Sequence, residues 1–142
     1  MKKLLAFVLL AALFTSCDKK KDDPAPATTN NTNTNTNSMN GDWKVNVYDN
    51  TPVTAPMAAT YKATASSATG GTVHFDITFD GTQHHTEDCT YTLSSGNTKA
   101  DFTKTGGDYT VLSGGKTWTI TKLDASALEI TSGFGLVMKM SK

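Results

Sequence analysis

Apolar and polar residues alternate with a period of two along the chain from residue 41 to residue 142. In the clearest run, residues 72–80, polar positions are interleaved with the apolar residues Val73, Phe75, Ile77 and Phe79. This alternation is typical of β-strands that bury one face and expose the other. We count nine such runs, at residues 43–47, 57–64, 72–80, 89–93, 100–102, 109–111, 118–120, 128–130 and 134–140.

Short turn sequences separate these runs at regular intervals. Examples are Asp80-Gly81, Gly106-Gly107-Asp108 and Ser132-Gly133, which contain the residue types that tight turns require. The pattern predicts an all-β fold, an antiparallel meander that is closed into a barrel or folded into a sandwich. An odd number of strands cannot close a purely up-and-down antiparallel barrel. Either one run is therefore not a strand, or the last strand pairs irregularly with the first.

The first 16 residues do not belong to this pattern. Lys2 and Lys3 precede an uninterrupted apolar run of 11 residues, 4–14, which is followed by two small residues. This arrangement predicts a signal peptide over residues 1–16. The apolar run is too short for a permanent transmembrane helix, which needs about 20 apolar residues.

Leu13-Phe14-Thr15-Ser16-Cys17 resembles a bacterial lipobox, in which the cysteine becomes the lipidated first residue of the mature chain. The resemblance implies that Cys17 carries fatty acyl chains such as palmitate. These chains would anchor the protein to the outer membrane of the cell envelope. The alternative is an ordinary secretory peptide with an incidental cysteine. Asp18 favours retention at the inner membrane, whereas the charged cluster 18–23 favours export to the cell surface, so the membrane face is left open.

Residues 18–40 are poor in apolar side chains and include a low-complexity Thr/Asn stretch at 28–38. Such a segment cannot bury apolar surface. We therefore expect residues 17–40 to form the lipidated cysteine and a disordered tether, whose 23 residues after Cys17 would reach about 25 to 30 Å as a flexible coil. Residues 41–142 then form one domain, long enough for a single core, and we expect it to be a monomer.

The charge composition argues against nucleic-acid binding. The chain has 13 lysines, no arginine, and 13 acidic residues, so its formal net charge is zero. Without arginine there are no bidentate contacts to phosphate, and a balanced charge leaves no basic patch that could hold a phosphate backbone.

The beginning of the domain resembles the lipocalins. Gly41-Asp42-Trp43 matches the GxW signature of that family, in which the tryptophan plugs the closed end of the barrel. Residues 116–130, with Trp118 in the first half, resemble the strand, turn and strand that recur in small lipocalin-like domains of bacterial lipoproteins. The resemblance covers residues 41–142. It implies a small closed barrel of about eight or nine strands, with structural roles for Gly41, Trp43 and Trp118.

Histidines and carboxylates near the third run are candidate metal ligands by residue type. A three-residue turn after Phe79 pairs that residue with Gln83 and fixes the parity of the following strand. The side chains of His74, Asp76, His84 and Asp88 then face outward, whereas those of His85 and Glu87 face inward. Because the histidines diverge onto two faces, we predict no metal site, and we expect His74 and Asp88 to form a cross-strand charge pair.

The inward His85 and Glu87 need an explanation, because ionisable groups on a core face are costly unless they are paired, hydrated or used. Either a β-bulge turns them outward, or they line a wet opening. The loops at residues 49–56 and 80–82 are expected at the same, open end of the barrel. We therefore predict that a small amphipathic ligand binds there, with its polar part near Gln83, His85 and Glu87. Its apolar part would contact Phe75, Ile77, Phe79 and Tyr91.

No catalytic constellation is found in the sequence. There is no glycine-framed nucleophilic serine, no phosphate-cradling glycine loop and no carboxylate pair in a recognisable motif, so we predict a non-enzymatic protein without a cofactor. Cys89 is left as a lone thiol once Cys17 is acylated. Its place in an alternating run predicts a small buried hydrophobic residue, with a reactive nucleophile as the alternative.

The second function class is a structural or protein-interaction domain whose core is filled by its own side chains. An eight-stranded barrel is either just filled or holds one small ligand. Eight bulky residues are expected to point inward: Trp43, Phe75, Phe79, Tyr91, Phe102, Tyr109, Trp118 and Phe134.

Overall fold

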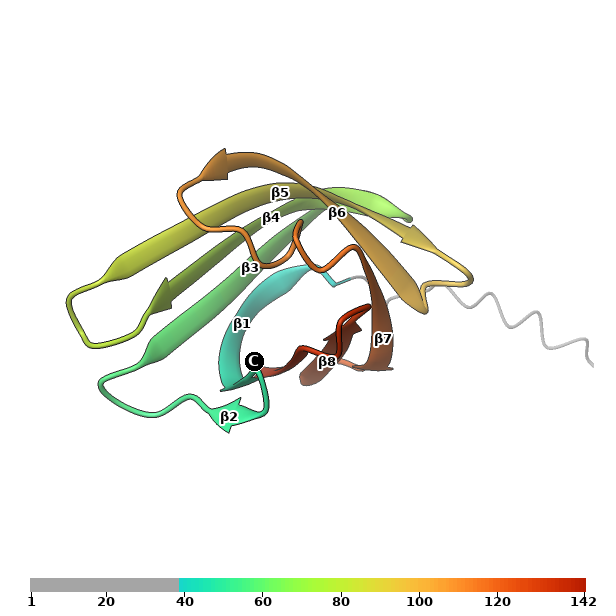
Figure 1. Cartoon of the computed structure of the whole chain (residues 1–142). Helices are drawn as coiled ribbons and strands as arrows, with labels where there is room; N and C mark the ends of the chain where they lie inside the picture. Colours follow the sequence, from blue (N-terminus) through green and yellow to red (C-terminus); the bar gives the residue numbers. More distant parts are fainter. Residues whose placement is uncertain (1–38) are drawn as a thin grey trace, which may run out of the picture. The chain divides into compact units, whose positions relative to one another are not determined.

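The computed structural model of the chain describes residues 39–142, which form nine β-strands and no helix (Figure 1). No helix in this part of the chain is therefore long and apolar enough to cross a bilayer. Cys17 and the predicted signal peptide and tether lie outside the described residues. The strands are β1 (Gly41–Tyr48), β2 (Thr51–Pro52), β3 (Ala58–Ser67), β4 (Gly70–Thr78), β5 (His84–Ser94), β6 (Lys99–Gly107), β7 (Thr117–Leu123), β8 (Ala127–Ser132) and β9 (Val137–Ser141).

The strands form one antiparallel sheet that closes on itself. Their order in the sheet is β2-β1-β3-β4-β5-β6-β7-β8-β9, and β1 pairs in addition with β9. That pairing runs from Lys44 opposite Ser141 to Tyr48 opposite Met138. It closes a barrel of eight strands, to which the two-residue β2 is attached at the end of β1. The prediction of an antiparallel meander closed into a small barrel is confirmed.

The prediction of a strand at residues 109–111 is wrong. This segment lies in the loop between β6 and β7, which turns into the space enclosed by the strands (Figure 1). The alternation of Tyr109 and Val111 is interrupted because the next residue, Leu112, is fully buried as well. With this run removed, the number of long strands is even, as an up-and-down barrel requires.

The inward orientation expected of Phe134 is also wrong. Phe134 is 70% exposed, the only large hydrophobic side chain that is exposed in the part of the chain the structure describes. It lies in the loop between β8 and β9, flanked by Gly133 and Gly135, and the strand predicted from residue 134 begins only at Val137. Alternation with Leu136 therefore did not indicate a strand here.

The other bulky residues fill the barrel largely as expected. Phe79 and Tyr109 are half-buried, and the buried members of the set are Trp43, Phe75, Tyr91, Phe102 and Trp118. Tyr61, which is also fully buried, adds to this core. The centre of the barrel is thus occupied by the chain's own side chains.

The two ends of the barrel differ. The hairpin end comprises the β3–β4, β5–β6 and β7–β8 turns and residues 39–40. Trp43 lies there, 2% exposed, and its indole Nε1 donates a hydrogen bond of 2.7 Å to the carbonyl oxygen of Met39. The loop end carries the other four connections, at residues 49–57, 79–83, 108–116 and 133–136.

Candidate ligand-binding site at the loop end

The turn between β4 and β5 fixes the parity of the site residues. Oδ1 of Asp80 accepts hydrogen bonds from the backbone N–H groups of Thr82 (2.9 Å) and Gln83 (2.7 Å). These bonds lower the pKa of Asp80 to about 2, and the bond from Gln83 has the largest effect. Phe79 N–H donates to the carbonyl of Gln83 (3.3 Å), and the pairing of β4 with β5 then continues without a bulge. The predicted register is confirmed, and the alternative of a bulge at Gln83 is not found.

Glu87 is fully buried and holds the loop that follows β6. Its Oε2 accepts hydrogen bonds of 2.7 Å each from the backbone N–H groups of Val111 and Leu112. Its Oε1 accepts the backbone N–H (3.0 Å) and the hydroxyl (2.6 Å) of Ser113. Burial raises the pKa of Glu87, but the four hydrogen bonds outweigh burial and leave the pKa below its ordinary value. Glu87 is therefore a carboxylate that is satisfied by the chain itself.

We call residues 108–116 the plug loop, because they close the barrel at this end. Leu112 is fully buried, and its carbonyl oxygen accepts a 2.8 Å hydrogen bond from Nε1 of Trp118. Gly115 N–H donates to the carbonyl of Val111 (3.0 Å). The loop is thus tied to β5 through Glu87 and to β7 through Trp118.

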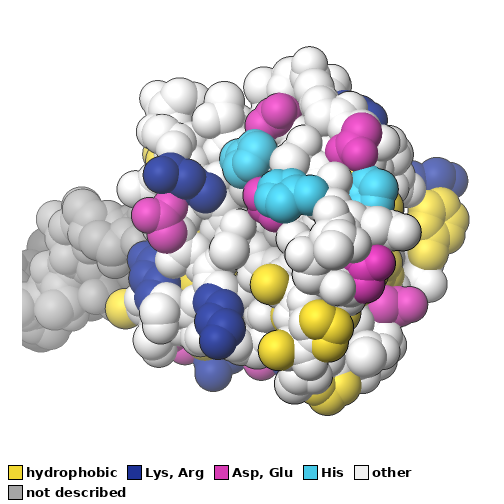
Figure 2. Space-filling view, turned by 90° about the vertical axis from the view of Figure 1, so that its left-hand side faces the viewer, with side chains coloured by type: hydrophobic (Ala, Val, Ile, Leu, Met, Phe, Trp, Pro, Cys, Tyr) yellow, Lys and Arg dark blue, Asp and Glu magenta, His cyan; other side chains and the backbone are white. Residues whose placement is uncertain are grey.

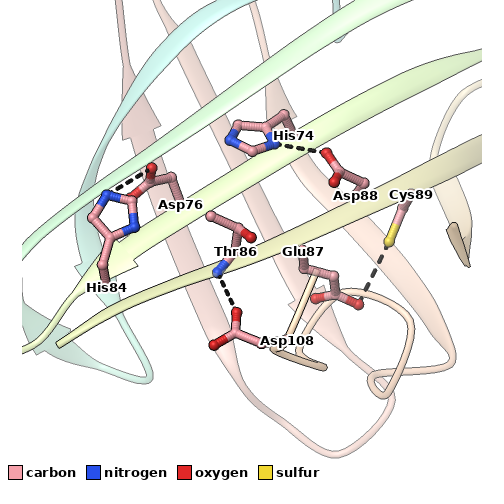
Figure 3. Close-up of polar contacts among 8 residues, drawn as sticks. All are labelled: His74, Asp76, His84, Thr86, Glu87, Asp88, Cys89 and Asp108. Atoms are coloured by element: carbon pink, nitrogen blue, oxygen red, sulfur yellow. Dashed lines mark hydrogen bonds and ion pairs between the residues drawn. The ribbon is translucent and has the colours of Figure 1, made fainter. Parts of the chain in front are cut away.

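Cys89 lies beside the Glu87 carboxylate that holds the plug loop, with its thiol 3.5 Å from Oε1 of Glu87 (Figure 3). It is 1% exposed, which confirms the prediction of a small buried residue. Burial, followed by the negative charge of Glu87, raises the pKa of the thiol to about 12. A thiol with this pKa is protonated at neutral pH, and only the thiolate is a good nucleophile.

His85 lies at the rim of the loop end, with one third of its side chain exposed. Its Nδ1 is 2.8 Å from Oδ2 of Asp108. Oδ1 of the same aspartate accepts the backbone N–H of Thr86 (2.8 Å); this bond and that from His85 lower the pKa of Asp108. The imidazole stacks on the ring of Tyr109, with centroids 5.3 Å apart, and meets the edge of Phe79 at 6.0 Å.

Tyr48 joins this aromatic group from β1. Its hydroxyl lies 3.2 Å from that of Tyr109, and its ring contacts those of Phe75 (6.2 Å) and Phe79 (6.4 Å). The group therefore extends from the buried core to the surface of the loop end.

A hollow of about 330 Å³ opens beside Tyr48 and Tyr109, and we call it the mouth hollow. Its apolar lining consists of Tyr48, Tyr109, Val111, Trp118, Leu136 and the exposed Phe134. Hydroxyls and small residues complete it: Thr110, Gly114, Gly115 and Ser132. The plug loop forms one wall and the loop between β8 and β9 forms another.

None of the seven residues predicted to contact a ligand lines the mouth hollow. Phe75, Ile77 and Tyr91 belong to the buried core, Glu87 is held by the plug loop, and Gln83 is exposed on the turn. Phe79 and His85 lie next to the hollow, in contact with Tyr109. Three of the lining residues that sequence reasoning missed, Tyr48, Tyr109 and Phe134, are aromatic residues beside glycine or Asp/Asn turns, and that combination was the available signal.

The outer face of β4 and β5 carries the other two histidines. His74 Nδ1 is 2.7 Å from Oδ1 of Asp88, as predicted, and His84 Nε2 is 3.2 Å from Oδ2 of Asp76. Figure 2 shows histidine and acidic side chains gathered on one face of the domain, and Figure 3 shows the two pairs apart from Glu87. Exposed pairs of this kind contribute little stability. Within residues 39–142, no group of three or more such side chains is arranged to hold a metal ion.

A comparison of the chain with protein families, curated proteins and solved structures finds no match.

Proposed function

We propose that this chain is a lipid-anchored protein of the bacterial cell envelope whose lipocalin-like barrel binds a small amphipathic ligand in the mouth hollow. The observation that carries the binding proposal is an aromatic hollow of about 330 Å³ at the loop end. Small-molecule pockets begin at about 300 Å³ and combine an apolar lining with a few polar groups. Here the polar groups are hydroxyls, including those of Tyr48 and Tyr109.

The filled core supports a site at the mouth instead of the barrel centre. Tyr61, Phe75 and Trp118 are fully buried, and Leu112 of the plug loop packs among the core residues. A ligand at the centre would have to displace these side chains, whereas the mouth hollow is open.

Protein interaction is a second candidate function, favoured by one observation. The ring of Phe134 is 70% exposed at the edge of the mouth hollow. An exposed aromatic ring beside a hollow is also a typical anchor for a partner protein. Binding of a small probe in the hollow separates this candidate from the first.

Replacement of Phe134 by alanine is expected to weaken probe binding without unfolding the domain. The neutral probe N-phenyl-1-naphthylamine would lose one wall of the hollow, and we expect its dissociation constant to rise about fivefold, which corresponds to about 1 kcal/mol. The measurement is a titration of the non-acylated full chain, Cys17→Ala, followed through the backbone amide NMR signals of Gly114 and Gly115.

Leu123→Ala serves as the control for this variant. Leu123 is half-buried at the hairpin end and does not line the mouth hollow, so its loss should leave probe affinity unchanged. If the probe shifts neither amide signal, or if both variants bind it equally well, the mouth hollow is not the binding site.

Replacement of Cys17 by alanine is expected to abolish acylation. The lipobox assigns the acyl chains to this cysteine, and several chains, at about 0.8 kcal/mol per buried methylene, give stable membrane attachment. The measurement is incorporation of radiolabelled palmitate in a Gram-negative host. Cys89→Ala changes the other cysteine of the chain and should keep the label. A Cys17→Ala protein that still carries palmitate would rule out the anchor.

A further inference from the structure

We propose that the ligand of the mouth hollow is an organic cation, a protonated or quaternary amine attached to an apolar body. This inference rests on the binding function proposed above and adds the chemical class of the ligand. Three observations carry it: the aromatic lining, the carboxylates near Tyr48, and the position of Lys116.

Aromatic side chains from four segments line the hollow, and Trp118 of β7 is one of them. The other three are Tyr48 from β1, Tyr109 from the plug loop and Phe134 from the loop between β8 and β9. The faces of aromatic rings carry negative electrostatic potential and attract cations, most strongly where water is partly excluded. A hollow bounded by several such rings is the arrangement that recognises quaternary ammonium groups.

Among the residues that the structure describes, the walls of the hollow, as distinct from its rim, carry no charged side chain that would pair with an anion. A ligand carboxylate inside the hollow would therefore lose hydration without gaining a counter-ion from its walls. The two tyrosine hydroxyls lie 3.2 Å apart, and one can donate to the other. Oxygen lone pairs then remain that can accept a hydrogen bond from a ligand N–H.

Lysines lie at the rim of the hollow, whereas carboxylates lie near Tyr48. Nζ of Lys104 is 3.1 Å from the hydroxyl of Thr110, and Nζ of Lys116 lies over the ring of Phe134. Asp49 follows Tyr48 directly, and Glu87 is held beneath the plug loop. Burial and the hydrogen bond to Tyr109 raise the pKa of Tyr48 most, and the negative charges of Asp49 and Glu87 raise it further. Both carboxylates therefore act on the Tyr48 hydroxyl, where their potential would attract a cation.

Lys116 shows how a cation sits at this rim. Its Nζ lies 5.2 Å from the centroid of the Phe134 ring, within the distance at which ammonium groups interact with ring faces. A ligand cation would compete with Lys116 for this ring, whereas a ligand anion would be attracted by the lysine. Removing the lysine charge should therefore strengthen the binding of a cation and weaken the binding of an anion.

The test compares three probes of similar shape on the non-acylated full chain, Cys17→Ala. Benzyltrimethylammonium is cationic, neopentylbenzene is its neutral carbon analogue, and phenylacetate is anionic. Dissociation constants are measured from the amide NMR signals of Thr110 and Gly115, which line the hollow. We expect the cation to bind about tenfold more tightly than phenylacetate and several-fold more tightly than neopentylbenzene.

Two variants make the test specific. Lys116→Gln should lower the dissociation constant of benzyltrimethylammonium by about threefold, because the competing ammonium group is gone. Lys142→Gln is the matched control. Lys142 lies at the hairpin end, with its Nζ 4.5 Å from the centroid of the Trp43 ring. Its replacement should leave the dissociation constant of benzyltrimethylammonium unchanged. Phe134→Leu keeps an apolar side chain but removes the ring. It should weaken the binding of benzyltrimethylammonium more than the binding of neopentylbenzene.

Three outcomes would overturn the inference. Tighter binding of phenylacetate, with Lys116→Gln weakening it, would assign the hollow to anions. Equal affinity for benzyltrimethylammonium and neopentylbenzene would show that the hollow does not distinguish charge. In both cases the proposed binding function stands. If neither these probes nor N-phenyl-1-naphthylamine binds, the proposed function itself fails and the inference fails with it.

Discussion

Replacement of Glu87 by glutamine is expected to lower the free energy of unfolding by about 3 kcal/mol or more. The carboxylate accepts four hydrogen bonds from Val111, Leu112 and Ser113. A glutamine of the same shape has one carbonyl oxygen, and its NH₂ group would face N–H donors. At least one buried donor would lose its acceptor, and the remaining bonds would lose their charge assistance. Urea denaturation followed by tryptophan fluorescence measures the change.

Glu129→Gln is the matched control for this prediction. Glu129 lies partly exposed on β8, 3.5 Å from Nζ of Lys139, and neutralising such a surface pair should cost less than about 1 kcal/mol. If Glu87→Gln were no more destabilising than Glu129→Gln, the plug loop would not depend on the carboxylate. The amide signals of Val111 and Leu112 should in addition move in the Glu87 variant only.

The same variant changes the response to acid. Because the pKa of Glu87 is lower in the folded protein than its ordinary value of 4.5, the group contributes stability above its unfolded pKa. That contribution is lost as the pH falls below 4.5 and through the folded pKa. The wild-type chain should therefore lose stability in this acidic range more steeply than Glu87→Gln, which has no proton to take up at this position.

The register around Glu87 could be predicted from the sequence because two local features determine it. The alternation along residues 72–80 assigns one face of β4 to the core, and the three-residue turn after Phe79 transfers that assignment to β5. A period of two leaves no freedom once the turn length is known. The sequence thus identified Glu87 as an acidic residue on a core face, which is what the structure contains.

The partner of Glu87 could not be predicted, because it is a backbone segment 24 to 26 residues further along the chain. Backbone N–H groups are present at every residue except proline, so no residue type marks which ones will meet a buried carboxylate. Tyr109 and Val111 moreover alternate like a strand, and Phe134 alternates with Leu136. Period-two patterns of two residues are too short to separate a strand from a loop that folds inward.

The mouth hollow could not be predicted for a related reason. Its lining comes from β1, the plug loop, β7, the last residue of β8 and the β8–β9 loop. The sequence placed the loops at residues 49–56 and 80–82 at one end of the barrel, and they do lie at the loop end. Which aromatic side chains of that end turn toward one another depends on how the plug loop is held. That in turn depends on the contact with Glu87.

Replacement of Gly107 by alanine is expected to cost about 2 to 4 kcal/mol, because this residue directs the chain into the plug loop. Gly107 has a φ of +83°, which L-residues rarely adopt. A Cβ atom at this position would in addition press on backbone atoms of β5, at 2.7 Å from the carbonyl carbon of Thr86 and 2.9 Å from Cα of Glu87. Neither backbone atom can move without disturbing the strand that carries Glu87. Thermal or urea unfolding measures the loss.

Gly96→Ala separates the two parts of this expectation. Gly96 lies in the β5–β6 turn with a φ of +67°, but a Cβ there would have no heavy atom within 4 Å. Its replacement should cost only the backbone strain, about 1 kcal/mol. The difference between the two variants then measures the crowding against β5.

The same crowding should displace Val111 and Leu112 from Glu87. Probe binding in the mouth hollow should therefore fall in Gly107→Ala and persist in Gly96→Ala. Equal losses of stability in the two variants would mean that the path of the chain after β6 is not constrained by contact with β5.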